Sequence, residues 1–237
     1  MHIEPNEIQV WSAELSPEPD QETEQFATLS QEERERADRF RFPVHRTRFI
    51  ATRFMLRKIL SEYLNVAPQT ISFAYTQHQK PYLNFPADSR LNFNVSNSDD
   101  LGLFAFTLDH AIGVDIEKIQ DVYKQAVAER FFSPHENAEL MRMSPRDQIR
   151  GFYRIWSRKE ALIKAVGKGL SIPLTSFTVT VNDVPEMVEL EDVIWQLIPL
   201  KIHTGYESAV ATSMLVKKIS IWGFFDQQPG LVSSVLI

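Results

Sequence analysis

Two acidic residues lie two positions apart in the segment GVDIEKI, residues 113–119. Asp115 and Glu117 alternate there with apolar residues, which is typical of a β-strand with one buried face. In a strand both carboxylates would project to the same side, with their Cα atoms about 7 Å apart. At that separation they could share one divalent cation. They could equally form the charged outer face of an edge strand, where charge discourages association.

A second charged cluster lies in WSRKEALIKAVGKGL, residues 156–170. The apolar spacing predicts a helix over residues 146–166 that ends at Gly167. Glu160 and Lys164 would lie on one side of that helix, away from its apolar face. Taken alone, these two residues could be a solvated ion pair one helical turn apart.

Considered together, the two segments favour chemistry at phosphate groups. Asp115, Glu117 and Glu160 would offer the oxygen ligands that Mg²⁺ prefers, and Mn²⁺ would suit them too. Lys164 could reach phosphates bound to that metal. A metal ion and basic side chains around phosphates are typical of phosphoryl-type transfer, in which positioning and charge neutralisation dominate. The sequence contains neither a Walker loop nor a GxGxxG motif, so the usual nucleotide-binding folds are not expected.

The composition indicates an ordinary globular protein of 237 residues, 43% of them hydrophobic. The absence of cysteine excludes disulfides and thiolate metal sites and fits a reducing compartment. The N-terminal segment is unlike a secretory signal, and no apolar run approaches the roughly 20 residues of a membrane helix. We therefore expect a soluble, cytoplasmic protein with no membrane association.

The charge distribution is uneven along the chain. A net charge of −6 argues against general nucleic-acid binding. Residues 39–58 nevertheless contain seven basic residues and no acidic one. A local basic patch on an acidic protein suggests a small polyanionic ligand rather than a long polymer.

The hydrophobic pattern predicts strands and helices in both parts of the chain. Strands are expected at residues 7–15, 71–75, 91–95, 101–108, 113–119, 177–181, 194–202, 207–212 and 220–225. Helices are expected at residues 30–40, 45–64, 122–132, 133–143 and 146–166. Each part contains helices and several strands, with a joint near residue 110. The sequence thus predicts an α/β (α+β) protein with two halves, residues 1–110 and 111–237.

The pair of motifs GVDIEKI and WSRKEALIKAVGKGL resembles the signature of 4′-phosphopantetheinyl transferases. The larger, Sfp-type branch is also matched in order and spacing by QKPYL (79–83), FNVSNS (93–98), RFFSPHE (130–136) and LSIPLTSFTV (170–179). The resemblance covers roughly residues 30 to 212. It implies a monomeric pseudo-dimer of two similar halves, each an antiparallel-type sheet packed with a long helix, with the active site between them.

The implied reaction moves the 4′-phosphopantetheine moiety of coenzyme A, the substrate, to a serine of an acyl or peptidyl carrier protein. Adenosine 3′,5′-bisphosphate is released. Two other functions stay open at this point. One is a different Mg²⁺-dependent enzyme acting on a phosphorylated small molecule. The other is a module that binds coenzyme A or a carrier protein without catalysis.

The resemblance also implies roles for single residues. Asp115, Glu117 and Glu160 match the magnesium carboxylates, Glu160 also matches the general base, and Lys164 matches a catalytic phosphate contact. Seven residues match the family's coenzyme A contacts: Arg46, Thr47, Lys80, Pro81, Ser96, Asn97 and Lys164. The family normally has histidine at the position of Asn97, and a loosely aligned lysine at that of Glu33. Asparagine brings no positive charge, so the 3′-phosphate contact is expected to be weaker. Trp156 is interpreted as a packing residue.

Carrier docking is expected to be local and partly apolar, because both the enzyme and typical carrier proteins are acidic. The segment QDVYKQAVAERFF after the acidic strand is the candidate surface, with Tyr123 and Lys124 as the test positions. Val122, Ala126 and Val127 could equally belong to the core.

Overall fold

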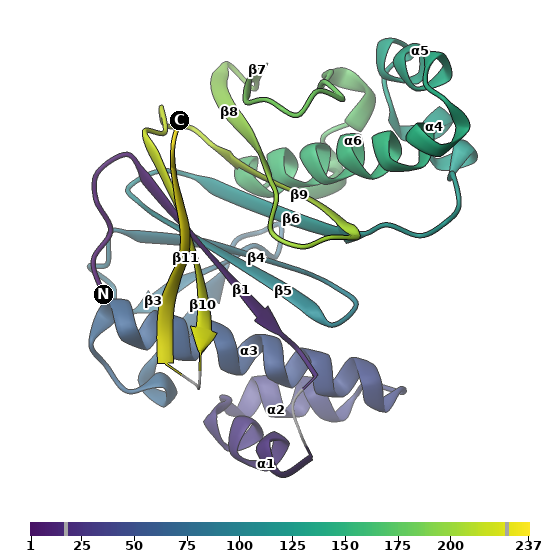
Figure 1. The fold of residues 1–237 in the computed structure, drawn as a ribbon. Coiled ribbons are helices and arrows are strands. Elements are labelled where there is room, and N and C mark those ends of the chain that lie inside the picture. The colour runs from purple at the N-terminus through teal and green to yellow at the C-terminus, as the bar shows by residue number, and fades with distance from the viewer. Residues whose placement is uncertain (17–18, 226–227) are drawn as a thin grey trace.

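The computed structural model describes residues 1–16, 19–225 and 228–237. Two β-sheets pack face to face, and a long helix covers the outer side of each sheet (Figure 1). The predicted mixed α/β architecture with two similar halves, each an antiparallel sheet packed with a long helix, is confirmed. Among the described helices, none is long and apolar enough to cross a membrane.

The first half builds its sheet from three antiparallel strands in the order β1-β5-β4. These strands are β1 (Glu7–Glu14), β4 (Leu91–Ser98) and β5 (Leu101–Leu108). The long helix α3 (Pro43–Leu64) packs on the outer face and buries a core that includes Trp11, Leu56 and Phe104. The remaining elements are α1 (Pro19–Thr28), α2 (Gln31–Asp38), a 3₁₀ turn (Pro68–Thr70) and a small hairpin of β2 (Ser72–Tyr75) and β3 (Pro81–Phe85).

The second half repeats this plan with four antiparallel strands in the order β6-β9-β8-β7. They are β6 (Ile112–Lys118), β7 (Glu186–Leu190), β8 (Val193–Leu200) and β9 (Tyr206–Thr212). The long helix α6 (Pro145–Val166) covers the outer face, and two short helices, α4 (Gln125–Phe131) and α5 (Pro134–Arg142), precede it. Val10 and Leu103 of the first sheet pack against Val114 and Ile198 of the second.

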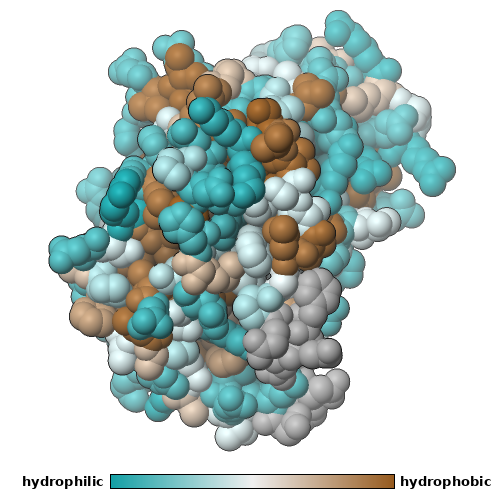
Figure 2. All heavy atoms as spheres, turned by 60° about the vertical axis from the view of Figure 1, so that its left-hand side comes forward, coloured by the Kyte–Doolittle hydropathy of each residue, from teal (hydrophilic) through white to brown (hydrophobic). Residues whose placement is uncertain are grey.

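The last two strands follow the expected joint in the sequence, but they belong to the first sheet. β10 (Lys218–Phe225) pairs in parallel with β1, and β11 (Gln228–Leu236) extends the first sheet to the order β11-β10-β1-β5-β4. A division of the chain at residue 110 therefore does not separate the two sheets. The strands β3, β7 and β11 and the helix α1 were not predicted. Figure 2 shows the molecule with the left-hand side of Figure 1 turned forward, and apolar groups lie there in separate patches among polar ones.

The prediction of a strand at residues 177–181 is wrong. Phe177, Val179 and Val181 do face the core in alternation, which explains why the pattern predicted a strand. The backbone of this segment is bound by side chains instead of a neighbouring strand. Glu136 accepts from the N–H of Val179 at 2.8 Å, and Arg158 donates to the carbonyl of Thr180.

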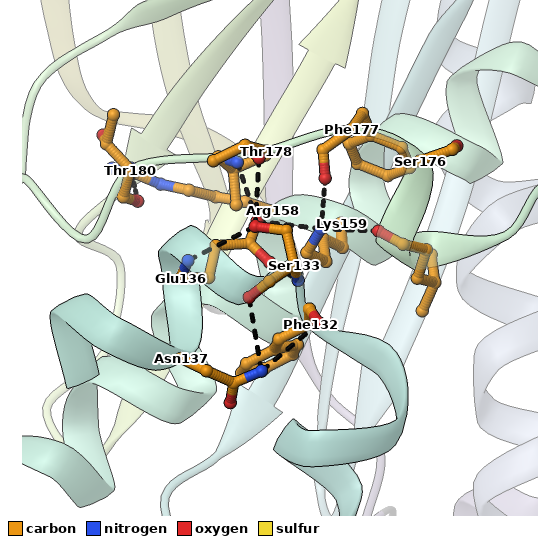
Figure 3. A network of polar contacts seen from close by, with 12 residues as sticks. Phe132, Ser133, Glu136, Asn137, Arg158, Lys159, Ser176, Phe177, Thr178 and Thr180 are labelled. Atoms are coloured by element: carbon orange, nitrogen blue, oxygen red, sulfur yellow. Dashed lines mark hydrogen bonds and ion pairs between the residues drawn. The ribbon is translucent and has the colours of Figure 1, made fainter. Parts of the chain in front are cut away.

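A buried ion pair holds this segment against α6 (Figure 3). Lys159 and Glu136 are both fully buried, with 2.8 Å between Nζ and Oε1. The same ammonium donates to the carbonyls of Leu174 and Phe177 at 2.7 and 2.8 Å. Glu136 also closes a capping box with Ser133 at the start of α5. One lysine and one glutamate thus connect two helices to a segment without regular structure.

Gly113 lets α6 approach β6 more closely than any other residue type would allow. A Cβ atom at this position would lie 2.1 Å from the carbonyl oxygen of Ala161 and 2.3 Å from the nitrogen of Ala165. Both are backbone atoms, which cannot move aside as a flexible side chain would. The glycine of the GVDIEKI motif therefore sets the spacing between the acidic strand and the helix that carries Glu160.

Candidate functional site

The two halves meet along a seam, the facing edges of β4 (Leu91–Ser98) and β6 (Ile112–Lys118). Side chains of β4, rather than a backbone ladder, join these edges. Asn94 accepts from the N–H of Val114 at 2.9 Å, and Ser98 accepts from the N–H of Lys118 at 3.0 Å. Each half therefore supplies polar groups to the other at the position of the predicted site.

Asp115 lies at the centre of the seam and is only 3% exposed. Its Oδ1 accepts from Nζ of Lys164 at 2.6 Å and from Oγ of Ser96 at 2.8 Å. Lys164 also donates to Ser96 at 2.9 Å, so three predicted site residues are in mutual contact. Burial raises the pKa of Asp115, although the charge of Lys164 opposes that shift. The second oxygen of Asp115, Oδ2, is buried without a hydrogen-bond partner.

Glu117 and Glu160 lie close enough to feel the charge of Asp115. Burial, reinforced by Asp115, raises the pKa of Glu117 to about 7, and the same two causes raise the pKa of Glu160. Trp156 donates its indole N–H to Glu117 at 3.1 Å. The carboxylate of Glu160 has no hydrogen bond to any described residue. Asp115 thus contacts the ammonium of Lys164 directly, while Glu117 and Glu160 interact with both groups only through their charges.

A divalent cation would need oxygen ligands that converge on one point. Within the described part of the chain, no three histidine, aspartate or glutamate side chains converge closely enough to hold an ion. Asp115 nevertheless has a buried oxygen without a partner, and the neighbouring carboxylates repel each other. Both features suit a hard cation with oxygen ligands, such as Mg²⁺, although the three carboxylates would have to draw closer together to hold one.

The predicted basic patch at residues 39–58 is largely paired with acids from other segments. Arg46 pairs with Glu22, and Thr47 donates to the same carboxylate at 2.7 Å. Arg48 pairs with Asp99 and Asp100. A polyanionic ligand at these residues would therefore have to compete with the acids that pair with them. Sequence spacing does not show which acids approach from other elements.

Glu33 aligns loosely with a lysine of the family, and its surroundings show why a carboxylate is suited to this position. It is buried between Arg53 and Arg57, with 2.8 Å between Arg57 Nε and its Oε2. Burial opposes ionisation, but both arginines and the N–H of Ser30 together lower the pKa of Glu33. The predicted capping box of Ser30 and Glu33 is also confirmed.

The other predicted coenzyme A contacts are spread along the two halves. Asn97 is exposed and points to the opposite face of β4 from Ser96. Pro81 is half-buried at the start of β3. The ammonium of Lys80 donates to the carbonyls of Ile112 and Ala165 at 3.0 and 3.1 Å. The structure thus brings Ser96 to the acidic cluster and leaves Asn97 outside it.

Two family models together match most of the chain. The model of the 4′-phosphopantetheinyl transferase superfamily matches residues 111–209, and that of the 4′-phosphopantetheinyl transferase N-terminal part matches residues 13–108. The 4′-phosphopantetheinyl transferase HetI of Nostoc sp. is 41% identical over 169 residues, 70% of this chain and 71% of HetI. Sfp of Bacillus subtilis is 34% identical over 200 residues, 81% of this chain and 86% of Sfp. The chain belongs to the 4′-phosphopantetheinyl transferase family.

The predicted function is thereby confirmed in outline: this transferase is an enzyme that moves phosphopantetheine from coenzyme A to carrier proteins. A non-catalytic binding module and a different Mg²⁺-dependent enzyme are not favoured.

Trp156 takes a part in the site of this transferase that was not predicted. It packs on Phe131 and Phe152, as expected, and in addition its indole N–H binds Glu117. A signal was present in the sequence, since Trp156 precedes Glu160 by one helical turn on the side that carries the acid. Ser98, which contacts Glu117 at 3.5 Å, was also missed.

The candidate docking segment of the transferase is partly core and partly surface. Tyr123 packs edge-on against Phe152, and its hydroxyl is buried without a partner. The ammonium of Lys124 lies 5.3 Å from the ring centroid of Tyr153. Val122 is 56% exposed, and Ala126 is exposed as well. The alternative that Val122 and Ala126 are core residues is therefore wrong.

Two hollows among the described residues lie away from the acidic cluster. One, of about 650 Å³, opens where β1 and β10 diverge and is lined by Ser12, Phe54 and Trp222 among others. The other, of about 450 Å³, is lined by Arg150, Arg154 and Glu207 among others. Neither of these two hollows is lined by Asp115, Glu160 or Lys164.

Proposed function

We propose that this transferase moves the 4′-phosphopantetheine moiety of coenzyme A onto a serine hydroxyl of an acyl or peptidyl carrier protein. The serine oxygen forms a bond to the β-phosphorus, and the bond from that phosphorus to adenosine 3′,5′-bisphosphate breaks. The observation that carries this proposal is the contact of Asp115 with Lys164 beside Glu117 and Glu160. Carboxylates and an ammonium group around one point suit a pyrophosphate and its cation.

The chain's own residues supply the proton transfer and part of the charge neutralisation. Glu160 is half-buried, and none of the described residues occupies its carboxylate by a hydrogen bond, so it is available to accept the serine proton. The raised pKa of Glu160 makes it a stronger base than an exposed glutamate. Lys164 would place its positive charge near the phosphates. Mg²⁺ or Mn²⁺, when held by Asp115, Glu117 and Glu160, would neutralise charge on the pyrophosphate.

Coenzyme A is proposed to bind across both halves, with residues 1–110 contacting its nucleotide and residues 111–237 carrying the metal and catalytic groups. The nucleotide contacts would be Arg46, Thr47, Lys80, Pro81, Ser96 and Asn97, and Lys164 would contact the phosphates. Arg46 and Thr47 both bind Glu22, so a 3′-phosphate would have to compete with that carboxylate. This competition and the neutral Asn97 both favour a weak 3′-phosphate contact.

We further propose that the enzyme acts as a cytoplasmic monomer and has no nucleic-acid or membrane partner. Both halves of the site belong to one chain, and the absence of cysteine fits a reducing compartment. Which class of carrier protein it modifies is a matter for experiment.

Mass spectrometry of apo carrier proteins tests the proposed function. Fatty-acid, polyketide and peptide-synthetase carriers would each be incubated with the enzyme, coenzyme A and Mg²⁺. We expect at least one carrier to gain the mass of phosphopantetheine at its serine, and a chelator to abolish the gain. Binding of coenzyme A without modification of any carrier would favour the non-catalytic module instead.

The carrier is proposed to dock on the segment that contains Tyr123 and Lys124. Tyr123→Ala would also remove a contact with Phe152, so the exposed Val122 is a cleaner position to change. Val122→Glu and Lys124→Glu are each expected to raise the KM for carrier protein about 5- to 20-fold, because each adds a charge that repels an acidic partner. The KM for coenzyme A should stay unchanged. Normal carrier kinetics in both variants would place the docking surface elsewhere.

A further inference from the structure

Lys80 is a partly buried lysine whose ammonium binds only backbone carbonyls. Nζ donates to Ile112 at 3.0 Å and to Ala165 at 3.1 Å. None of the described carboxylates forms an ion pair with it, and burial lowers the pKa of Lys80 to about 8. Removing an ammonium from water without a counter-charge is costly. Such an arrangement points to a role other than stabilising the fold.

The two carbonyls that bind Lys80 belong to the two segments that carry the site. Ile112 begins β6, the strand of Asp115, and Ala165 directly follows Lys164 in the last turn of α6. The carbonyl of Ala165 is among the last four of the helix, which lack partners within the helix. A cation there also interacts favourably with the helix dipole. A single side chain thus ties the start of the acidic strand to the end of the catalytic helix.

The strand and the helix touch backbone to backbone between these two carbonyls. Gly113 approaches Ala161 and Ala165 so closely that a Cβ atom would overlap their backbone atoms. Lys80 therefore binds immediately beside the closest contact between β6 and α6. The distance of 2.6 Å between Asp115 and Lys164 depends on the relative position of these same two elements.

Lys80 is itself firmly held by the first half of the molecule. It lies in the turn between β2 and β3, where the hydroxyl of Thr76 accepts from the N–H of Lys80 at 3.2 Å and from that of His78 at 3.3 Å. Its aliphatic part runs along Gly167, where a Cβ atom would lie 3.3 Å from Cδ of Lys80. Gly167 has φ of 80°, a conformation that favours glycine.

We propose that Lys80 is a positioning residue, which fixes β6 against the end of α6 from the opposite half and so sets the contact of Asp115 with Lys164. This inference rests on the proposed catalytic function of those two residues. It gives the ammonium of Lys80 a role that differs from a contact with the coenzyme A nucleotide, which the main chain of the same turn could still make.

Steady-state kinetics of Lys80→Met and Lys80→Arg test the proposal. Methionine keeps the apolar stem and removes the charge, whereas arginine keeps donors for the two carbonyls. We expect Lys80→Met to lower kcat about 10- to 100-fold through misplacement of the reacting groups, while the KM for coenzyme A changes less than about twofold. Lys80→Arg should regain part of kcat. The control Lys217→Met, at an exposed lysine, should match the wild type.

Hydrogen exchange provides a readout that does not depend on turnover. In Lys80→Met, the amides of residues 112–118 and 165–167 should exchange faster than in the wild type and in Lys217→Met. A raised KM for coenzyme A with unchanged kcat would overturn the proposal and make Lys80 a ligand contact. Unchanged exchange would overturn it as well.

Two further outcomes remain decisive. If Lys80→Met does not fold, Lys80→Arg decides, because a kcat loss at constant KM is still expected there. If the wild type modifies no carrier, the proposed function fails, and the exchange comparison alone then decides whether Lys80 positions the two segments.

Discussion

Glu160→Ala and Asp115→Ala should each lower phosphopantetheine transfer by about 10²- to 10⁴-fold, the usual range for loss of a general base or a comparable charged group. Glu160→Ala removes the proposed proton acceptor. Asp115→Ala removes a proposed metal ligand and leaves Lys164 and Ser96 without their shared partner. Glu117→Ala should be milder, since water can replace one ligand of Mg²⁺. Carrier modification measured at several Mg²⁺ concentrations checks all three variants.

The control for these changes is Glu189→Ala, which removes an exposed carboxylate from β7. It should leave transfer unchanged. Full activity of Asp115→Ala or Glu160→Ala at millimolar Mg²⁺ would show that the acidic cluster is not the reacting centre. Asp115→Asn separates the effect of charge from that of shape, because asparagine can still accept from Ser96.

Lys159→Met should lower the free energy of unfolding by about 3–5 kcal/mol, the usual effect of breaking a buried ion pair. The substitution leaves Glu136 charged and buried with no cation beside it, and it also frees the carbonyls of Leu174 and Phe177. Unfolding in denaturant measures the change. The matched control is Lys168→Met, which breaks the surface pair with Glu191 and should cost less than about 1 kcal/mol.

The double variant Lys159→Met with Glu136→Leu separates the pair from its surroundings. If the cost arises from an uncompensated charge, the double variant should be more stable than Lys159→Met alone. Equal stability of the single and double variants would assign the loss to the carbonyls of residues 174 and 177 instead. Lys159→Met as stable as the wild type would contradict both accounts.

The acidic strand and the catalytic helix could be predicted because their signals are short-range. Alternation within GVDIEKI gives the strand, and the spacing of Glu160 and Lys164 places both on one side of a helix. Gly167 ended that helix as predicted, in a left-handed conformation. Such patterns depend on the period of one element and need no knowledge of its neighbours.

Contacts between distant segments could not be predicted in this way. Nothing in the spacing of Arg53 and Arg57 shows that Glu33 lies between them, or that Glu22 takes Arg46. The motif around Lys80 predicts a coenzyme A contact, but it gives no sign that the ammonium binds two carbonyls of the other half. For residues 177–181 alternation predicted a strand. In the structure, side chains of Arg158 and Glu136 bind the backbone of this segment in place of a neighbouring strand. In each case tertiary contacts decided the outcome.

The chain passes between the two sheets twice, through residues 109–111 and 213–217, and the two passages touch (Figure 1). The carbonyl of Ala111 accepts from Oγ1 of Thr212 at 2.8 Å and from the N–H of Ser213 at 3.4 Å. The halves are therefore tethered covalently at one end of β6, whereas the other end, at Lys118, is held by side chains of Ser98 and Asp99. Any parting of the sheets must pivot near Ala111, so that Glu117 would travel further than Asp115.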